Sequence, residues 1–194
     1  MNDLVLKGVR VAILATDGVE KVELTLPRLA LEEAGADTVL IAPKPEIQSM
    51  KHDERDERFA VDMALKDASP DEFDAVLLPG GALNADKLRM ETAAREIVQQ
   101  IDSAGKPIAA ICHAPWLLVS AKLVKGRRLT SYYTLQDDIR CAGGEWEDRE
   151  VLVDRNWVTS RKPDDIPAFN REMRSLFAKS RAGRALGGRE GALT

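Results

Sequence analysis

Histidine and cysteine are both scarce in this chain. His52 and His113 are its only histidines, and Cys112 and Cys141 are its only cysteines. A zinc site built from clustered cysteine and histidine has too few candidate ligands here, and we expect no metal and no other cofactor. Two cysteines make no disulfide framework, although a single bridge between them stays open. Because a chain without such a framework is typical of a reducing compartment, we expect a cytoplasmic protein.

Long apolar runs and an excess of positive charge are also missing. No apolar run reaches the roughly 18 residues that a membrane-spanning helix needs. The first eight residues contain no long apolar core and no cleavage site, which argues against a signal peptide. The formal net charge of −4 argues against a general nucleic-acid-binding protein, whose domain is usually basic. We therefore expect neither a membrane nor a nucleic acid as a partner.

The size and composition are those of one globular domain. The chain has 194 residues, of which 44% are hydrophobic and 31% are charged, so that a substantial core can form. The segment 181–194 carries glycines and arginines without periodicity, which is typical of a flexible tail. We predict a single domain over residues 1–180, followed by this tail over residues 181–194.

Strand and helix patterns alternate along the chain. Apolar runs that predict strands occupy residues 9–15, 38–42, 73–79, 107–111, 151–153 and 157–160. Helical spacing is found over residues 23–34, 87–104, 116–123 and 167–178. The alternation predicts an α/β fold with a mainly parallel sheet and helices on both faces. A mixed charge run at residues 51–58 predicts a solvated loop or the tip of a hairpin. The alternative is that this segment covers the site or contacts another subunit.

Cys112 lies at the turn between a predicted strand and a predicted helix. Such a turn holds the side chain out of the core and near a helix N-terminus, where backbone N–H groups and the helix dipole favour a thiolate. This is the arrangement of a nucleophile elbow, with cysteine in place of serine. A lone cysteine in a strand is more often a core residue, but the elbow and the adjacent His113 favour a chemical role. Cys141 has no such context, and we interpret it as structural.

Three loops should meet at the carboxyl edge of the sheet, where open parallel sheets bind their ligands. They are the loop after the first strand, the Gly80–Gly81 turn and the Cys112 elbow. The glycine pair is either a plain tight turn or an oxyanion hole, because glycine N–H groups can closely approach a developing negative charge. His113 is a candidate general base or a group that stabilises a thiolate. Adjacency in sequence does not prove that it contacts the sulfur.

Glu20 and Glu23 lie at the start of the first predicted helix. The helix dipole alone explains carboxylates at this position. A functional interpretation is that Glu23 reaches the cysteine sulfur, where a buried, protonated carboxyl group could donate a hydrogen bond. Glu20 is then a candidate substrate-binding residue.

Several segments, taken in order, resemble the PfpI family, within the superfamily that includes the parkinsonism-associated deglycase and the class I glutamine amidotransferase-like proteins. The matching segments are Asp17–Leu24, Asp74–Gly81, Ala110–Pro115, Leu129–Tyr132 and Val158–Asp165. The similarity covers roughly residues 8 to 178, and the sequence Ala-Ile-Cys-His is its most specific part. It implies a flavodoxin-like three-layer sandwich, in which Cys112 is the nucleophile, His113 its partner and Glu23 a contact of the cysteine.

The resemblance also implies an oligomer. In related proteins an acidic residue just after the Gly-Gly turn of a neighbouring subunit orients the histidine. Asp86 is the nearest acidic residue in that stretch here, although the loop spacing differs from that of some relatives. With Asp86 in this role, the active site would be complete only in a homodimer or a higher oligomer.

We expect a cysteine-dependent hydrolase or lyase of the stress response that acts on glycation adducts or glyoxal-type aldehydes. Its partners would be a small aldehyde or a glycated protein or peptide. An intracellular cysteine peptidase is the alternative enzyme, and a redox sensor or chaperone that uses the oxidisable Cys112 is the alternative of another class. A glutamine amidotransferase is disfavoured because no histidine follows His113 in the chain.

Overall fold

The computed structural model describes residues 4–190, with side chains for residues 4–180, as a three-layer α/β sandwich. The strands of its middle layer are β1 (Arg10–Leu14), β3 (Asp37–Ala42), β6 (Met63–Ala64), β7 (Ala75–Leu78), β8 (Ile108–Ile111), β11 (Val151–Asp154) and β12 (Trp157–Ser160). They form one seven-stranded sheet in the order β11-β12-β8-β7-β1-β3-β6. All neighbouring pairs are parallel except the edge pair of β11 and β12.

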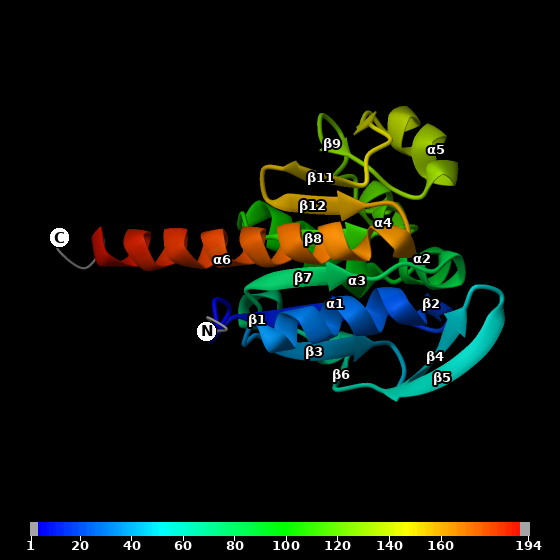
Figure 1. Cartoon of the computed structure of the whole chain (residues 1–194), viewed down its shortest axis with the longest axis horizontal. Helices are drawn as coiled ribbons and strands as arrows, with labels where there is room; N and C mark the ends of the chain where they lie inside the picture. The colour runs from blue at the N-terminus through cyan, green and yellow to red at the C-terminus, as the bar shows by residue number, and fades with distance from the viewer. Residues whose placement is uncertain (1–3, 191–194) are drawn as a thin grey trace.

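The five longer parallel strands have the order of a flavodoxin-like fold. When the two-residue edge strand β6, which pairs parallel with β3, is set aside, the spatial order is β3-β1-β7-β8-β12. Counted by appearance in the chain, this is the order 2-1-3-4-5 that flavodoxin-like sheets share. Helices lie on both faces of the sheet (Figure 1). The predicted α/β sandwich with a mainly parallel sheet is therefore confirmed.

The strands of the middle layer are short apolar runs that are buried on both faces. β7 reads Ala-Val-Leu-Leu and β8 reads Ile-Ala-Ala-Ile, and every residue of both is buried. Continuous apolar runs of this kind are expected where helices cover both faces of a parallel sheet. Neighbouring residues of β1 alternate between two cores, with Ala12 and Leu14 in one and Val11 and Ile13 in the other.

The helices divide between the two cores. They are α1 (Lys21–Glu33), α2 (Ala82–Leu88), α3 (Thr92–Ser103), α4 (Pro115–Ser120), α5 (Gln136–Cys141) and α6 (Ile166–Glu190). α1 and α6 lie side by side on the face of the sheet nearer the viewer in Figure 1. Leu31 of α1 and Phe169 of α6 share one core, whereas Ile97 of α3 and Leu117 of α4 belong to the other. None of the helices within residues 4–190 is long and apolar enough to cross a membrane.

The helix predicted over residues 87–104 begins only at Thr92, as α3, and residues 87 and 88 are the end of the preceding helix α2, which the sequence analysis did not predict. The N–H of Met90 donates to the carbonyl of Lys87 at 3.0 Å, and that of Glu91 donates to the carbonyl of Leu88 at 3.1 Å. These bonds span three residues, the tighter pattern that commonly ends an α-helix. Apolar residues keep helical spacing across this turn, so the sequence pattern does not reveal the break.

A second, three-stranded sheet follows the carboxyl end of β1. It consists of β2 (Val19–Glu20), β4 (Glu46–Lys51) and β5 (Glu54–Ala60). β4 and β5 form an antiparallel hairpin that extends away from the main sheet in Figure 1. The charge run at residues 51–58 covers the tip of this hairpin and part of β5, as the sequence predicts.

Several small elements have no counterpart in the sequence analysis. β9 (Arg128–Leu129) and β10 (Glu145–Trp146) form a two-stranded parallel sheet, and α5 lies between them in the chain. Short 3₁₀ helices occupy Leu65–Asp67, Pro70–Glu72, Tyr133–Leu135 and Pro163–Asp165. Elements of two or three residues are too short to show a periodic pattern.

The last helix is longer than predicted. A helix over residues 167–178 and a flexible tail over residues 181–194 were expected, but α6 continues to Glu190. No proline interrupts residues 168–190. A glycine inside a helix costs only about 1 kcal/mol relative to alanine, so the glycines there do not by themselves end it. Residues 191–194 lie outside the described residues, and the domain boundary at residue 180 stays a prediction.

Candidate active site

The carboxyl ends of β1, β7 and β8 bring three loops to one place. β7 lies between β1 and β8 in the sheet, so the turns that follow these strands are neighbours. The packing around Gly80 is so close that a Cβ there would overlap the carboxyl group of Glu23. The same Cβ would lie 2.6 Å from the Cβ of Cys112 and 2.8 Å from the carbonyl oxygen of Ile111. The structure thus brings the predicted residues Glu23, Gly80 and Cys112 together.

The backbone holds Cys112 in a strained turn. Its φ of 63° lies in the left-handed region, which non-glycine residues rarely adopt and which is common at functional sites. Its N–H donates to the carbonyl of Ser160 at 3.0 Å, and its own carbonyl accepts a bond from the N–H of Tyr132 at 2.8 Å. These two bonds fix the turn between β8 and α4, as a nucleophile elbow requires.

Cys112 lines a pocket of about 580 Å³. Glu23, Gly81, His113 and Tyr132 contribute to its wall, and the tip of the β4–β5 hairpin contributes His52. A cavity of this volume can take a small molecule or a modified side chain. The side chain of Cys112 reaches it although only 7% of the residue is exposed.

His113 contacts the sulfur of Cys112 and is half-buried. Its Nδ1 lies 3.2 Å from Sγ, so the contact that sequence adjacency leaves open is made. Its ring stacks on that of Tyr132, with the ring centroids 4.6 Å apart. Burial lowers the pKa of His113 below its usual 6.5, so the imidazole is neutral at pH 7 and can accept a proton. Within residues 4–180, Nε2 of this ring has no hydrogen-bond partner.

Glu23 is fully buried beside the sulfur. Neither of its carboxyl oxygens makes a hydrogen bond of ordinary geometry to another described residue. Burial raises the pKa of Glu23 to about 8, with the nearby Cys112 thiol and the Gly80 amide opposing and the Glu20 carboxylate reinforcing the shift. The carboxyl group is therefore protonated at pH 7 and can act as a donor toward the sulfur.

The pKa of Cys112 differs from the sequence-based expectation. Burial, together with the carboxyl group of Glu23, raises the pKa of the thiol well above its usual value, whereas the amides of Gly81 and His113 lower it. The expectation was that the turn itself favours the thiolate. Because α4 begins only at Pro115 and the sulfur is buried, the cost of desolvating a charge outweighs the helix dipole. The thiol keeps its proton at pH 7 until a base removes it.

Gly81 and Glu20 shape the pocket wall. Gly81 has a φ of 91°, and a Cβ there would lie 2.6 Å from the backbone nitrogen of Glu20, so that only glycine fits. The carboxylate of Glu20 accepts a hydrogen bond from the N–H of His52 at 3.0 Å. Glu20 therefore holds the tip of the β4–β5 hairpin next to the pocket that it also lines.

Asp86 lies apart from these residues within one chain. It is exposed on α2 and does not line the Cys112 pocket. Its side chain makes no hydrogen bond or ion pair with any other described residue. A role for Asp86 beside His113 would need a second copy of the chain, and this role stays a prediction.

Asn84 is a positioning residue that the sequence analysis did not single out. It is fully buried, and its side-chain carbonyl accepts a bond from the N–H of Thr16 at 2.7 Å. Its amide donates to the carbonyls of Pro79 and Gly80 at 3.0 and 2.9 Å. Asn84 thus joins the loop after β1 to the turn after β7. The one signal in the sequence is a polar residue in the first turn of a helix that follows the glycine pair.

No group of three or more histidine, cysteine, aspartate or glutamate side chains in the described part of the chain could hold a metal ion. Cys112 and Cys141 are both free thiols, so the bridge that the sequence leaves open does not form.

Comparison with known proteins gives consistent matches. The model of the DJ-1/PfpI family matches residues 9–175. A protein of Pyrococcus abyssi named as a deglycase is 43% identical over 168 residues, which cover 87% of this chain and 99% of the relative. YraA of Bacillus subtilis, named as a candidate cysteine protease, is 38% identical over 170 residues, with 87% of this chain and 98% of the relative covered.

One solved structure shows the same architecture. It is a two-domain protein of Anabaena variabilis with DJ-1/ThiJ/PfpI-like and ferritin-like domains. The TM-score is 0.81 at 31% identity, and the match covers 86% of this chain and 47% of that chain. The match covers about half of the Anabaena chain, as expected when only one of its two domains matches.

Proposed function

The chain belongs to the DJ-1/PfpI family, and we propose that it is a cysteine-dependent enzyme that removes glycation adducts or converts glyoxal-type aldehydes. The observation that carries the proposal is the contact of 3.2 Å between Cys112 Sγ and His113 Nδ1 at a left-handed elbow. The deglycase name of the Pyrococcus relative supports the substrate class. A cytoplasmic location and a part in the stress response belong to the same proposal.

The proposed reaction begins with attack of the Cys112 sulfur on the carbonyl carbon of the substrate. The S–C bond forms while the carbonyl electron pair moves to oxygen, and the thiol proton passes to Nδ1 of the neutral His113. The protonated Glu23 donates toward the sulfur and adds no negative charge there. The amides of Gly80 and Gly81 are the candidate donors for the oxygen that becomes negative.

With a free aldehyde, His113 then returns the proton to the negative oxygen, which gives a hemithioacetal. With a carbinolamine adduct of lysine, the sulfur bonds to the carbinol carbon, the C–N bond breaks, and His113 gives the proton to the leaving amine, which leaves the same hemithioacetal. A shift of hydrogen between the two adjacent carbons converts it to a thioester, and water hydrolyses the S–C bond to release the hydroxy acid and the Cys112 thiol.

A homodimer or higher oligomer is part of the proposal. Nε2 of His113 has no partner within residues 4–180, and Asp86 is exposed there without an ion pair. A carboxylate that accepted a bond from Nε2–H would hold the tautomer in which Nδ1 is free to take the thiol proton. We propose that Asp86 of a second copy supplies this carboxylate.

Two alternatives have a supporting observation each. A cysteine peptidase agrees with the name of the Bacillus relative, and the same attack on a peptide carbonyl would give a thioester and a free amine. A redox sensor agrees with the two unpartnered oxygens of Glu23 beside Cys112, since a protonated carboxyl could hold an oxidised sulfur.

Rates measured for the wild type and for Cys112→Ala separate these functions. The substrates are methylglyoxal, a peptide with a methylglyoxal-modified lysine, and casein. We expect the variant to lose turnover of the first two substrates, and casein to stay uncut by both proteins. Equal rates for the two proteins on every substrate would rule out catalysis by Cys112. Casein cleavage that needs Cys112 would favour the peptidase, and oxygen gained at Cys112 under mild peroxide without any turnover would favour the sensor.

A further inference from the structure

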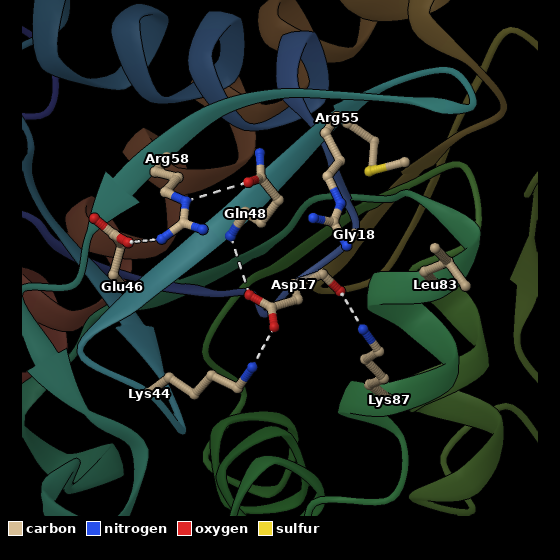
Figure 2. Close-up of a pocket in the computed structure, with 10 residues that line it drawn as sticks. Asp17, Gly18, Lys44, Glu46, Gln48, Arg55, Arg58, Leu83 and Lys87 are labelled. Carbon is tan, nitrogen blue, oxygen red and sulfur yellow. Dashed lines mark hydrogen bonds and ion pairs between the residues drawn. The ribbon is translucent and has the colours of Figure 1, made fainter.

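A second cavity lies next to the Cys112 pocket. Its volume is about 330 Å³, and Figure 2 shows the residues that surround it. Gly18, Met50 and Leu83 line both this cavity and the Cys112 pocket, so the two cavities are adjacent. A peptide that reaches Cys112 would therefore also lie beside the second cavity.

Positively charged side chains dominate the wall of this second cavity. They are Lys44, Arg55, Arg58 and Lys87. Two of these four positive charges are neutralised by ion pairs. Lys44 pairs with Asp17, and Arg58 pairs with Glu46 at 2.8 Å. Among the residues that the structure describes, Asp17 and Glu46 are the only carboxylates that line the cavity. Two positive charges are left over.

Arg55 and Lys87 carry the charges that are left over. The side chain of Arg55 makes no hydrogen bond or ion pair with another residue in the described part of the chain. The ammonium group of Lys87 makes one long bond of 3.4 Å to the backbone carbonyl of Asp17. Figure 2 shows Arg55 descending from the β4–β5 hairpin and Lys87 rising from α2, so that both reach the turn at Asp17 and Gly18 from opposite sides.

The local charge is opposite to that of the whole molecule. The chain carries a net charge of −4, yet this cavity has an excess of positive charge next to the proposed catalytic cysteine. A concave site of one sign attracts ligands of the other sign. A guanidinium and an ammonium group suit the oxygens of a carboxylate or a phosphate.

We propose that Arg55 and Lys87 form a subsite for an acidic side chain of a glycated peptide, close to the modified lysine that Cys112 attacks. The apolar side chains of Met50 and Leu83 line both cavities and lie where the two cavities adjoin. This inference rests on the proposed deglycase function and deepens it. It makes the enzyme selective for modified lysines that have acidic neighbours.

Peptide binding to Cys112→Ser protein tests the subsite, because this variant should not consume the adduct. The probes are labelled peptides with one central methylglyoxal-modified lysine, flanked on both sides by glutamate, by glutamine or by phosphoserine. Fluorescence anisotropy gives the Kd. We expect the glutamate peptide to bind about five-fold more tightly than the glutamine peptide, because exposed charge contacts contribute modestly. The phosphoserine peptide shows whether phosphate oxygens are preferred to carboxylate oxygens.

Substitutions of cavity residues test whether Arg55 and Lys87 cause the preference for the glutamate peptide. Arg55→Gln with Lys87→Gln should bring the ratio of the two Kd values to about one, and Arg55→Glu should favour the glutamine peptide, because a negative charge would then line the cavity. Lys66→Gln is the matched control, since it removes one exposed positive charge that lines neither cavity. Salt at about 0.5 M should also weaken the preference, because it screens exposed charges.

Equal binding of the glutamate and glutamine peptides would overturn the subsite, and so would a preference that survives the double substitution. Turnover is measured separately, with wild-type protein and the glutamine peptide. If no adduct is removed while the binding preference holds, the deglycase function is wrong and the subsite stands.

Discussion

At the scale of single residues, burial decides which groups of the site carry a proton at neutral pH. Burial raises the pKa values of Glu23 and Cys112 and lowers that of His113. At pH 7 all three groups are therefore uncharged in the resting site. A single proton transfer from the sulfur of Cys112 to Nδ1 of His113 generates the thiolate. Because Glu23 is protonated, it places no negative charge beside this thiolate.

This protonation pattern predicts a bell-shaped dependence of kcat/KM on pH. On the acid side the rate should rise as His113 loses its proton, at a pH below 6.5 because burial lowers its pKa. On the alkaline side it should fall near pH 8, where Glu23 ionises and places a negative charge beside the sulfur. Initial rates with methylglyoxal across this range give the profile. In Glu23→Gln the fall of kcat/KM near pH 8 should disappear. An unchanged fall in this variant would show that ionisation of Glu23 is not its cause.

Glu23 should also make stability depend on pH. Its pKa is about 8 in the folded chain against 4.5 for an unperturbed glutamate. The unfolded chain therefore ionises first as the pH rises, so the contribution of Glu23 is full below pH 4.5 and is lost progressively up to about pH 8. At pH 7 the contribution of Glu23 to the free energy of unfolding is lower by about 3 kcal/mol than it is below pH 4.5. This follows from 1.36 kcal/mol for each of the roughly 2.5 pH units between pH 4.5 and pH 7.

Urea unfolding of the wild type and Glu23→Gln at a series of pH values measures this loss. The glutamine side chain does not titrate, so the variant should gain stability relative to the wild type as the pH rises from about 5 to about 8. Parallel stability curves for the two proteins over this interval would show that Glu23 is ionised in the folded chain.

At the scale of elements, Asn84 makes the loops after β1 and β7 a single unit. Asn84→Ala would leave the buried N–H of Thr16 without an acceptor, at a cost of about 1–3 kcal/mol in the free energy of unfolding. It would also release the carbonyl of Gly80, whose turn borders Cys112. We therefore expect both stability and kcat to fall, as measured by urea unfolding and by initial rates.

Asn156→Ala is the matched control for this prediction. The amide of Asn156 donates to the carbonyl of Lys106 at 3.0 Å and to Asp102 at 2.9 Å, and neither partner lines the Cys112 pocket. This variant should lose stability and keep the kcat of its folded fraction. An equal loss of kcat in both variants would mean that Asn84 acts through stability alone.

The elements that the sequence predicts best are those with a strong local pattern. β7 and β8 are continuous apolar runs, and their ends locate Gly80 and Cys112 at one edge of the sheet. The break between α2 and α3 and the two-residue strands have no such pattern. The bonds of Asn84 and the stacking of Tyr132 on His113 depend on residues far apart in the chain. The pKa of Cys112 was misjudged because it depends on burial, which a turn motif does not specify.

At the scale of the whole molecule, the single chain leaves one contact of the site unmade. His113 has a partner for Nδ1 and none for Nε2 among the described residues, while Asp86 is exposed on α2. The orienting carboxylate of our proposal must then come from another copy. Our proposal makes activity a property of the assembly, and it predicts that inactive chains complement one another.

Co-expression of Cys112→Ala and Asp86→Asn chains with different affinity tags tests this complementation. In a mixed dimer, one site combines an intact Cys112 with the intact Asp86 of the other chain. Doubly purified dimers should therefore recover about half of the wild-type rate, because one of two symmetric sites is complete. If Asp86 acts within its own chain, every site of the mixed dimer carries a substitution, and the rate stays as low as in the parents. A fully active monomer in light scattering would also rule out the shared site.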